Sequence, residues 1–179
     1  MRRTASDRLM VVLPTPVVAI IPLFCALVGV VVSSIPLSLS DGRIPPPLFA
    51  LMCIYFWSLV RPDLVPPGVV FVIGLAEDLL SGGPPGLWTA SFIITYILLD
   101  RQREVFASLA GWAAILGFAV AMLIASVSAY GIGWLWYLRQ PPIEPLALQL
   151  AVSILFYVPV GSFLNWLNRR MVGPMRSDF

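Results

Sequence analysis

The chain has 179 residues, of which 59% are apolar and 11% charged, and its formal net charge is +2. Soluble domains carry about 25% charged residues, and a chain of this length has room for one domain that could not hide so much apolar surface from water. Composition therefore excludes an ordinary soluble protein and predicts a single domain, residues 1–179, embedded in a lipid bilayer. The small net charge gives no indication of nucleic-acid binding.

The residue types that usually carry chemistry are scarce. No histidine is present, which removes the most frequent general base and metal ligand. Cys25 and Cys53 both lie inside apolar runs, where they are typical of small buried residues. The glycines at 82, 83 and 86 lack the lysine and hydroxyl residue of a phosphate-binding loop. We therefore expect no catalytic residues, no cofactor and no metal.

Apolar runs separated by polar or proline- and glycine-rich breaks predict six membrane helices. The first run follows Met1-Arg2-Arg3, and we interpret it as a retained helix rather than a cleaved signal peptide. It is long, it lacks a good small-residue cleavage pattern, and further runs follow it. The expected spans are residues 16–35, 46–60, 65–80, 86–99, 106–137 and 146–168.

The distribution of arginine predicts the orientation of these helices. Every basic residue is an arginine. With six spans and a cytoplasmic amino terminus, only Arg43 and Arg139 lie outside, whereas every cytoplasmic segment contains arginine. We therefore expect both termini in the cytoplasm. The arginines on that side are Arg2, Arg3, Arg8, Arg61, Arg101, Arg103, Arg169, Arg170 and Arg176.

The third and fourth expected spans are short. At 1.5 Å per residue they reach only about 24 and 21 Å, less than the hydrocarbon thickness of about 30 Å. A turn-forming segment, Ser81–Gly86, joins them. Non-helical backbone at membrane depth is tolerated only inside protein or beside water. We therefore expect an indentation of the outer face near residues 78–88.

Glu77 and Asp78 are the most informative charges, because they lie near the outer end of the third span without a basic residue nearby. Carboxyl groups within membrane segments usually face the bundle interior or water. One hypothesis is a site that docks a partner or contacts a ligand. The structural alternative is that one of them accepts hydrogen bonds at the amino end of the fourth helix. Adjacent helical residues point about 100° apart, so both can hardly serve one small site.

Two cytoplasmic segments carry charges with ordinary explanations. Arg61 and Asp63 flank Pro62 in a short turn, where they either pair with each other or are simply solvated. Residues 100–104 form a mixed-charge loop that either contacts a cytoplasmic filament protein or only sets the topology.

Small residues recur at every fourth position of the fifth span. Such residues let helix backbones approach closely in a membrane. The row turns gradually around the helix, so it suits contacts with different helices at its two ends. Packing within the protein and packing against a partner's single membrane helix are both open. The row consists of Ala113, Gly117, Ala121, Ala125, Ala129 and Gly133.

The segments Arg61–Pro66 and Gly74–Leu87 resemble the MreD family of rod shape-determining membrane proteins. The family pattern is an Arg-Pro turn, a Gly-Leu-x-x-Asp-Leu run, a glycine- and proline-rich break, and a Gly-Leu helix start. Length and the six-span plan also agree. The positions that match are Arg61, Gly74, Asp78, Gly82 and Gly86.

This resemblance implies an all-α, multi-pass protein of the bacterial inner membrane, similar in fold to the substrate-binding subunits of energy-coupling-factor transporters. It implies a non-catalytic scaffold that binds MreC and supports peptidoglycan synthesis along the side wall. The wider complex would include MreB, RodA and a class B penicillin-binding transpeptidase. Glu77 and Asp63, beside the matching positions, join the candidate partner-binding or structural residues.

Two other classes of function remain as alternatives. A substrate-capture subunit of a vitamin-type transporter would use an outer cavity lined by Trp88, Glu77 and Asp78. An enzyme acting on lipid-linked substrates would need ionisable groups that converge at one depth, such as Glu77, Asp78 and Arg139.

Overall fold

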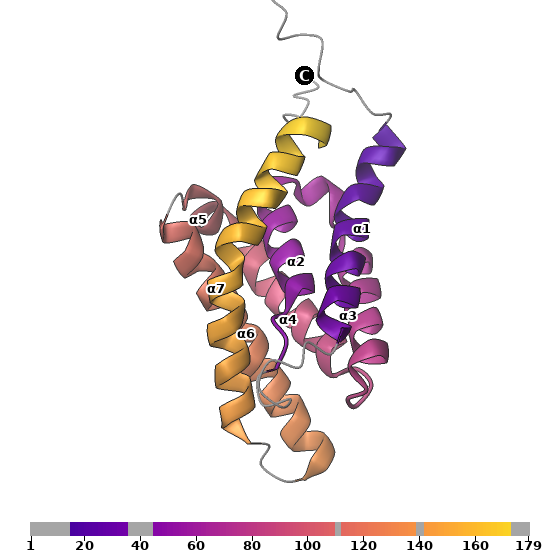
Figure 1. Cartoon of the computed structure of the whole chain (residues 1–179), viewed down its shortest axis with the longest axis vertical. Helices are drawn as coiled ribbons and strands as arrows, with labels where there is room; N and C mark the ends of the chain where they lie inside the picture. Colours follow the sequence, from indigo (N-terminus) through magenta and orange to yellow (C-terminus); the bar gives the residue numbers. More distant parts are fainter. Residues whose placement is uncertain (1–14, 36–44, 110–111, 139–141, 173–179) are drawn as a thin grey trace, which may run out of the picture.

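The computed structural model describes residues 15–35, 45–109, 112–138 and 142–172, and within these ranges every regular element is a helix. The helices of the bundle alternate in direction, and the described chain begins and ends at the same end of the molecule (Figure 1). The α-helices are α1 (Thr15–Ser34), α2 (Phe49–Val60), α3 (Pro67–Ser81), α4 (Leu87–Arg101), α5 (Arg103–Ser108), α6 (Trp112–Tyr137) and α7 (Ile143–Leu167); η2 (Pro62–Leu64) is a 3-10 helix and η3 (Asn168–Val172) a π-helix.

Each expected span contains a helix, but three of the expected starts differ clearly from those observed. Helix α7 begins at Ile143 rather than at residue 146. The run expected over 106–137 is divided, because α5 ends at Ser108, Leu109 has an extended conformation, and α6 begins only at Trp112. The span expected from residue 46 begins as a helix at Phe49. Proline lacks an N–H and disfavours helix in the residue before it, so Pro45-Pro46-Pro47 delays the start.

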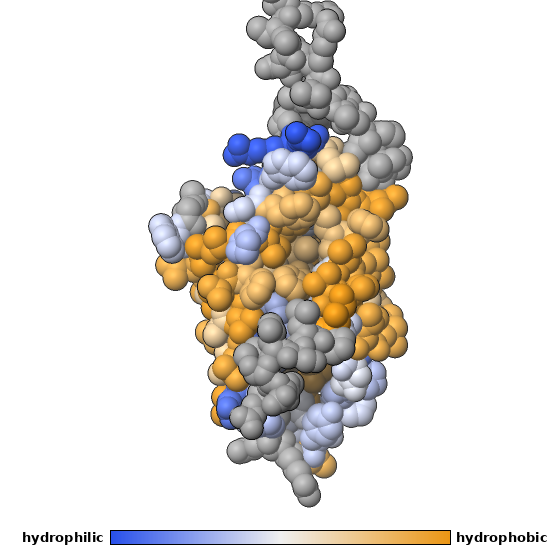
Figure 2. All heavy atoms as spheres, in the orientation of Figure 1, coloured by the Kyte–Doolittle hydropathy of each residue, from blue (hydrophilic) through white to orange (hydrophobic). Residues whose placement is uncertain are grey.

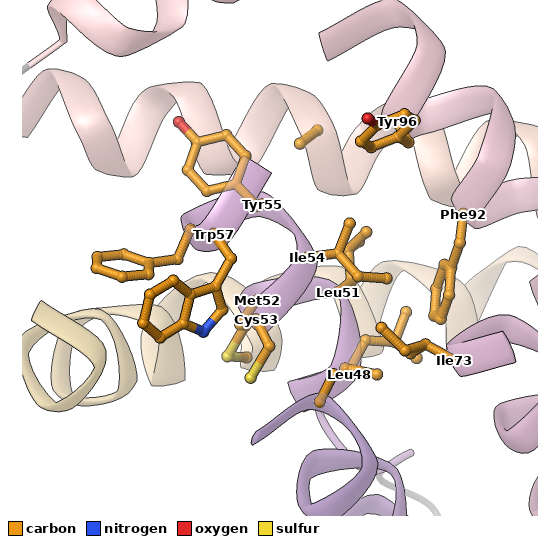
Figure 3. Packing of buried hydrophobic residues seen from close by; sticks show 14 of the residues in the cluster. Leu48, Leu51, Met52, Cys53, Ile54, Tyr55, Trp57, Ile73, Phe92 and Tyr96 are labelled. Carbon is orange, nitrogen blue, oxygen red and sulfur yellow. The ribbon is translucent and has the colours of Figure 1, made fainter. Parts of the chain in front are cut away.

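Helix α2 is the centre of the bundle. Its residues from Ala50 to Ser58 are all buried, so it has no side facing out. Helices α1, α4, α6 and α7 pack around it. Figure 3 shows the side chains of α2 among those of α3 and α4, with Leu51 and Ile54 close to Ile73 and Phe92. A helix that is apolar all round is typical of a fully enclosed position.

Pro47 and Leu48, which lead into α2, are buried, and polar side chains of α1 and α7 bind the backbone of this segment. Ser33 on α1 donates its hydroxyl to the Pro47 carbonyl at 2.9 Å. On α7, the Ser153 hydroxyl accepts the Leu48 N–H at 3.1 Å, and the Gln149 amide donates to the Pro46 carbonyl at 3.1 Å. Buried non-helical backbone needs such partners, because no water is available to it.

The outer surface of the bundle is apolar over most of its height. Phe24, Leu79, Leu116 and Leu155 are 64%, 74%, 68% and 72% exposed. Figure 2 shows an apolar band across the middle of the molecule with hydrophilic residues toward its ends. So large an exposed apolar surface marks a membrane-facing protein. By length and composition, α6 and the continuous helix from Ile143 to Met171 are each sufficient to cross a membrane.

Candidate functional site

The carboxylate of Asp78, near the end of α3, holds the beginning of α4. One oxygen, Oδ1, accepts the Trp88 N–H at 2.7 Å. The other, Oδ2, accepts the N–H groups of Gly86 and Thr89 at 2.9 and 3.1 Å and the Thr89 hydroxyl. The first N–H groups of a helix have no partner within the helix, and the helix dipole favours an anion there. Of Glu77 and Asp78, Asp78 is therefore the acid that accepts hydrogen bonds at the amino end of the fourth helix, as the structural alternative expected.

The turn between α3 and α4 depends on two glycines with positive φ. Gly82 follows α3 with φ of 66°, and Gly86 precedes α4 with φ of 90°. Only glycine adopts these backbone conformations without strain. Gly82 and Gly86 therefore have a structural role that accounts for their place in the motif.

Gly74 permits the close approach of α3 to α4. A Cβ at residue 74 would lie 2.5 Å from the Thr89 Cα and 3.1 Å from the Thr89 backbone nitrogen. These are backbone atoms, so a side chain at residue 74 would force the two helices apart. Gly74 and Asp78 are one helical turn apart and both face the first turn of α4.

Glu77 has a different environment from its neighbour. Its side chain is only 5% exposed, and its Oε2 atom is buried without a hydrogen-bond partner among the described residues. Because consecutive helical residues point about 100° apart, Glu77 is directed away from the contact that Asp78 makes with α4. An unsatisfied buried acceptor is costly, and carboxyl groups in membrane segments usually have a functional reason. Glu77 is therefore the buried acid whose carboxyl group is not satisfied by the described residues.

Arg61 and Asp63 bind each other across the short turn after α2. The Arg61 Nη2 and Nε atoms lie 2.9 and 3.1 Å from the two carboxylate oxygens of Asp63. The hydrogen bond from Arg61 lowers the pKa of the Asp63 carboxyl from its ordinary value. Of the two alternatives for these residues, pairing with each other is therefore the one observed. Asp63 lies within the 3-10 helix η2 (Pro62–Leu64).

The row of small residues on α6 faces the interior. Gly117, Ala121, Ala125, Ala129 and Gly133 are buried, and Ala113 is half-buried. Helix α6 packs against α4 and α7. A Cβ on Gly117 would collide with the Tyr55 hydroxyl of α2 and approach Leu109 to 2.9 Å. In this structure the row serves packing within the chain, which leaves little of it accessible to a partner helix.

Several residues of the structural network were not anticipated. Thr89 could not be anticipated as the partner of Asp78, because hydroxyl residues are frequent in membrane helices. Ser33, Gln149 and Ser153 are buried polar residues within apolar runs, a pattern that could have indicated bonds to the backbone of the triple proline. Arg139, required by the enzyme alternative, lies outside the described residues, within which no three metal-ligating side chains come together.

Comparison with known proteins now identifies the family. The expected likeness to energy-coupling-factor subunits stays a prediction, since no curated protein and no solved structure matches the chain. The family described as rod shape-determining protein MreD matches over residues 15–167, and this range contains the Asp78 bonds, the two turn glycines and Gly74. The resemblance inferred from Arg61–Pro66 and Gly74–Leu87 is thereby confirmed. The protein belongs to the MreD family of rod shape-determining membrane proteins.

Proposed function

We propose that this protein is a non-catalytic scaffold subunit of the bacterial elongation complex. It binds MreC in the inner membrane and so supports peptidoglycan synthesis along the side wall, together with MreB, RodA and a class B penicillin-binding transpeptidase. Family membership gives the role in rod shape determination. The observation that carries the binding role is the buried Oε2 atom of Glu77, an acceptor without a partner among the described residues.

The distribution of charge supports a scaffold over an enzyme. General acid–base catalysis needs ionisable groups close to one reacting atom. Asp78 already accepts hydrogen bonds from three N–H groups and a hydroxyl, and the carboxylate of Asp63 is paired with Arg61. Glu77 and Asp78 are the buried acids of the described residues, and they are directed to different sides of α3. In this arrangement Asp78 positions the helices, and Glu77 provides the one buried carboxyl oxygen of the described residues that has no hydrogen-bond partner.

Glu77 suits a partner that brings a hydrogen-bond donor to the outer end of α3. In a low-dielectric environment a hydrogen bond to a carboxyl group is stronger than in water. Oε2 is buried, so the Glu77 side chain would have to turn toward the partner, and no hydrogen bond of Oε2 to the described residues would be lost. The first turn of α4, fixed by Asp78, gives this end of the bundle a rigid outline. In the proposal, the donor comes from MreC where its helix leaves the membrane.

We further propose that six helices cross the membrane, with both termini in the cytoplasm. Their alternating directions support this count (Figure 1). Helices α3 and α4 have 15 residues each and reach only about 22 Å. Their shared turn ends short of the carboxyl end of α6 (Figure 1), in keeping with the expected outer indentation. The 12-residue α2 is enclosed by other helices, and Pro47 and Leu48 at its entry are buried, so the non-helical backbone of these two residues does not meet lipid.

The test is capture of partners on the tagged protein from native membranes in mild detergent, with mass spectrometry of the bound proteins. Wild-type protein should retain MreC. Glu77→Leu should reduce MreC recovery about tenfold, because a hydrogen bond to a charged or buried carboxyl is worth about 1.5–3 kcal/mol. The same change should raise the melting temperature of the isolated protein, since it removes a buried acceptor without a partner.

The matched control is Glu144→Leu, which changes an exposed acid in the first turn of α7 and should leave MreC recovery unchanged. Opposite effects of Glu77→Leu on stability and on recovery separate binding from folding. The proposal would be overturned if wild-type protein that is monodisperse in detergent retained no MreC. Recovery of ATPase subunits in its place would assign the protein to vitamin-type transport.

A further inference from the structure

A cavity of about 760 Å³ opens between α2, α5, α6 and α7. Its floor is the second half of α2, from Tyr55 to Val60, and its walls are α5 with the start of α6 on one side and the second half of α7 on the other. Figure 1 shows α5 at the edge of the bundle beside the upper half of α7. We call this cavity the α5–α7 groove. It contains none of the residues discussed above as partner-binding candidates.

Stacked aromatic rings close the deep end of the groove. Tyr157 of α7 lies flat on Phe118 of α6, with ring centroids 4.2 Å apart. Tyr55 of α2 meets both rings edge-on at 5.6 and 5.5 Å, and its hydroxyl donates to the Ala114 carbonyl at 3.3 Å. The groove beyond these rings is therefore bounded by a rigid, mainly apolar base.

The α7 wall becomes more polar toward the end of the chain. Tyr157 is buried at the base, Gly161 and Ser162 follow one turn later, and Asn165 lies a further turn along. Residues four apart share a helix face, so this face leads toward Arg169 beyond Asn165. The base of the groove is apolar, and its rim is first polar and then cationic. This order suits a molecule with an acyl chain at one end and an anionic group at the other.

The charges around the rim are positive in sum. Arg169 and Arg170 follow α7, and Arg170 lies over the Trp166 ring with its Cζ atom 5.1 Å from the centroid. Two adjacent cations at the end of this wall favour an anionic group. Arg101 and Arg103, at the junction of α4 and α5, are not among the residues that line the groove.

The groove is too small to enclose a whole membrane helix. A helix about 10 Å in diameter with a pitch of 5.4 Å occupies about 420 Å³ per turn. The groove, at about 760 Å³, holds fewer than two turns of the more than five that a membrane helix needs. An acyl chain is much thinner than a helix and is the molecule that surrounds a membrane protein at this depth.

We propose that the α5–α7 groove binds one acyl chain of an anionic phospholipid, whose phosphate lies against Arg169 and Arg170. The lipid belongs to the cytoplasmic leaflet, an assignment that rests on the orientation given under the proposed function. The binding itself does not involve MreC. Basic residues between membrane helices at the cytoplasmic side are suited to anionic head groups.

Gly161 gives a direct way to fill the groove. A Cβ there would meet only ring atoms of Tyr157, at ordinary contact distances of 3.5–3.7 Å, so that the backbone tolerates a side chain. Gly161→Leu therefore places four carbon atoms in the groove. The matched control is Gly131→Leu on α6, where a Cβ would have no neighbour within 4 Å and the residue is exposed.

The experiment uses the full chain, purified in a neutral detergent and mixed with phosphatidylglycerol or with phosphatidylcholine of the same acyl chains. Bound lipid is counted by native mass spectrometry, and the melting temperature is recorded. Phosphatidylglycerol should bind as one retained molecule and raise the melting temperature, whereas phosphatidylcholine should bind more weakly. Gly161→Leu should weaken retention about tenfold by occupying the space, and Arg169→Gln about fivefold by removing one cation.

Gly131→Leu and Arg101→Gln should retain phosphatidylglycerol as the wild type does. Equal retention of the two lipids would overturn the anionic part of the proposal, and full retention by Gly161→Leu would overturn the groove. If Gly161→Leu does not fold, Ser162→Phe at an exposed lining position fills the groove's outer part and decides the same question. A negative result in the lipid experiment would not count against MreC binding, because that experiment is done on the purified chain without a partner protein.

Discussion

The carboxylate of Asp78 on α3 accepts both the backbone N–H and the side-chain hydroxyl of Thr89 on α4. Two helices that are consecutive in the chain are thus joined by a side chain of one and the amino end of the other. The same carboxylate also accepts the N–H groups of Gly86 and Trp88. The contact fixes where α4 begins, and it makes Asp78 a determinant of stability before any question of partners arises.

Replacement of Asp78 should destabilise the protein in proportion to the hydrogen bonds lost. Asp78→Ala removes every acceptor and should lower the free energy of unfolding by about 3 kcal/mol, because bonds to a charged group are each worth about 1.5–3 kcal/mol and are not additive. Asp78→Asn retains one acceptor oxygen and should cost less. Thermal melting in detergent measures both, with Asp100→Asn on the exposed end of α4 as the control. Equal stability of Asp78→Ala and wild type would contradict the capping role.

Gly74→Ala should separate α3 from α4. The added Cβ would lie 2.5 Å from the Thr89 Cα, and backbone atoms cannot move aside as a flexible side chain can. We expect a loss of about 1–3 kcal/mol, the usual cost of overpacking. Gly68→Ala in the first turn of α3 is the matched control, because nothing lies within 4 Å of its Cβ. Melting curves should show destabilisation in the first variant and none in the second.

The Arg61–Asp63 pair predicts a small dependence of stability on pH. The pKa of the Asp63 carboxyl is lowered in the folded protein, chiefly by the hydrogen bond from Arg61. The pair therefore stabilises above the ordinary pKa of about 3.9, and this contribution is lost as pH falls through the folded pKa. Because the Asp63 side chain is 49% exposed, we expect at most about 1 kcal/mol.

The measurement is the melting-temperature difference between wild type and Asp63→Asn. This difference should be present at neutral pH and should disappear in acid below the ordinary pKa of aspartate. A difference that is independent of pH would assign the effect of the substitution to something other than the charge of Asp63.

The proposed topology predicts opposite accessibility of two turns. Gly83→Cys lies in the α3–α4 turn, where a Cβ would meet the Ser81 hydroxyl oxygen at 3.7 Å and no other atom of the described residues within 4 Å. Gln102→Cys lies in the exposed turn between α4 and α5. In intact spheroplasts, a membrane-impermeant thiol reagent should label Gly83→Cys and should label Gln102→Cys only after lysis. The wild-type chain is the control, since Cys25 is half-buried and Cys53 buried. The reverse pattern would place the termini outside.

The all-helical class, with a helix in each apolar run, could be predicted because membrane helices are long apolar runs with polar breaks between them. The ends were less predictable where special residues act. The triple proline before α2 postpones the helix to Phe49, and the break at Leu109 separates α5 from α6. Both departures occur inside apolar segments, where hydropathy alone gives no boundary.

The candidate site was predictable in its residues but not in the division of their roles. Glu77 and Asp78 are alike in sequence, and only the direction of each side chain from α3 separates them. Asp78 is directed at α4, whereas the Oε2 atom of Glu77 has no partner among the described residues. The α5–α7 groove could not be foreseen, because it is formed by four helices whose separation depends on how they pack.

The hydrogen bonds at the entry to α2 have a consequence for biogenesis. The Leu48 N–H finds its acceptor on Ser153 and the Pro46 carbonyl its donor on Gln149, more than one hundred residues later in the chain. Helix α2 is synthesised early, but the backbone at its entry cannot form these hydrogen bonds until α7 has been synthesised. Until then the nascent chain must keep these backbone groups near water or in contact with the insertion machinery. A chain truncated before α7 would thus be inserted into the membrane but not finished, and quality-control proteases would recognise it at its centre rather than at its cut end.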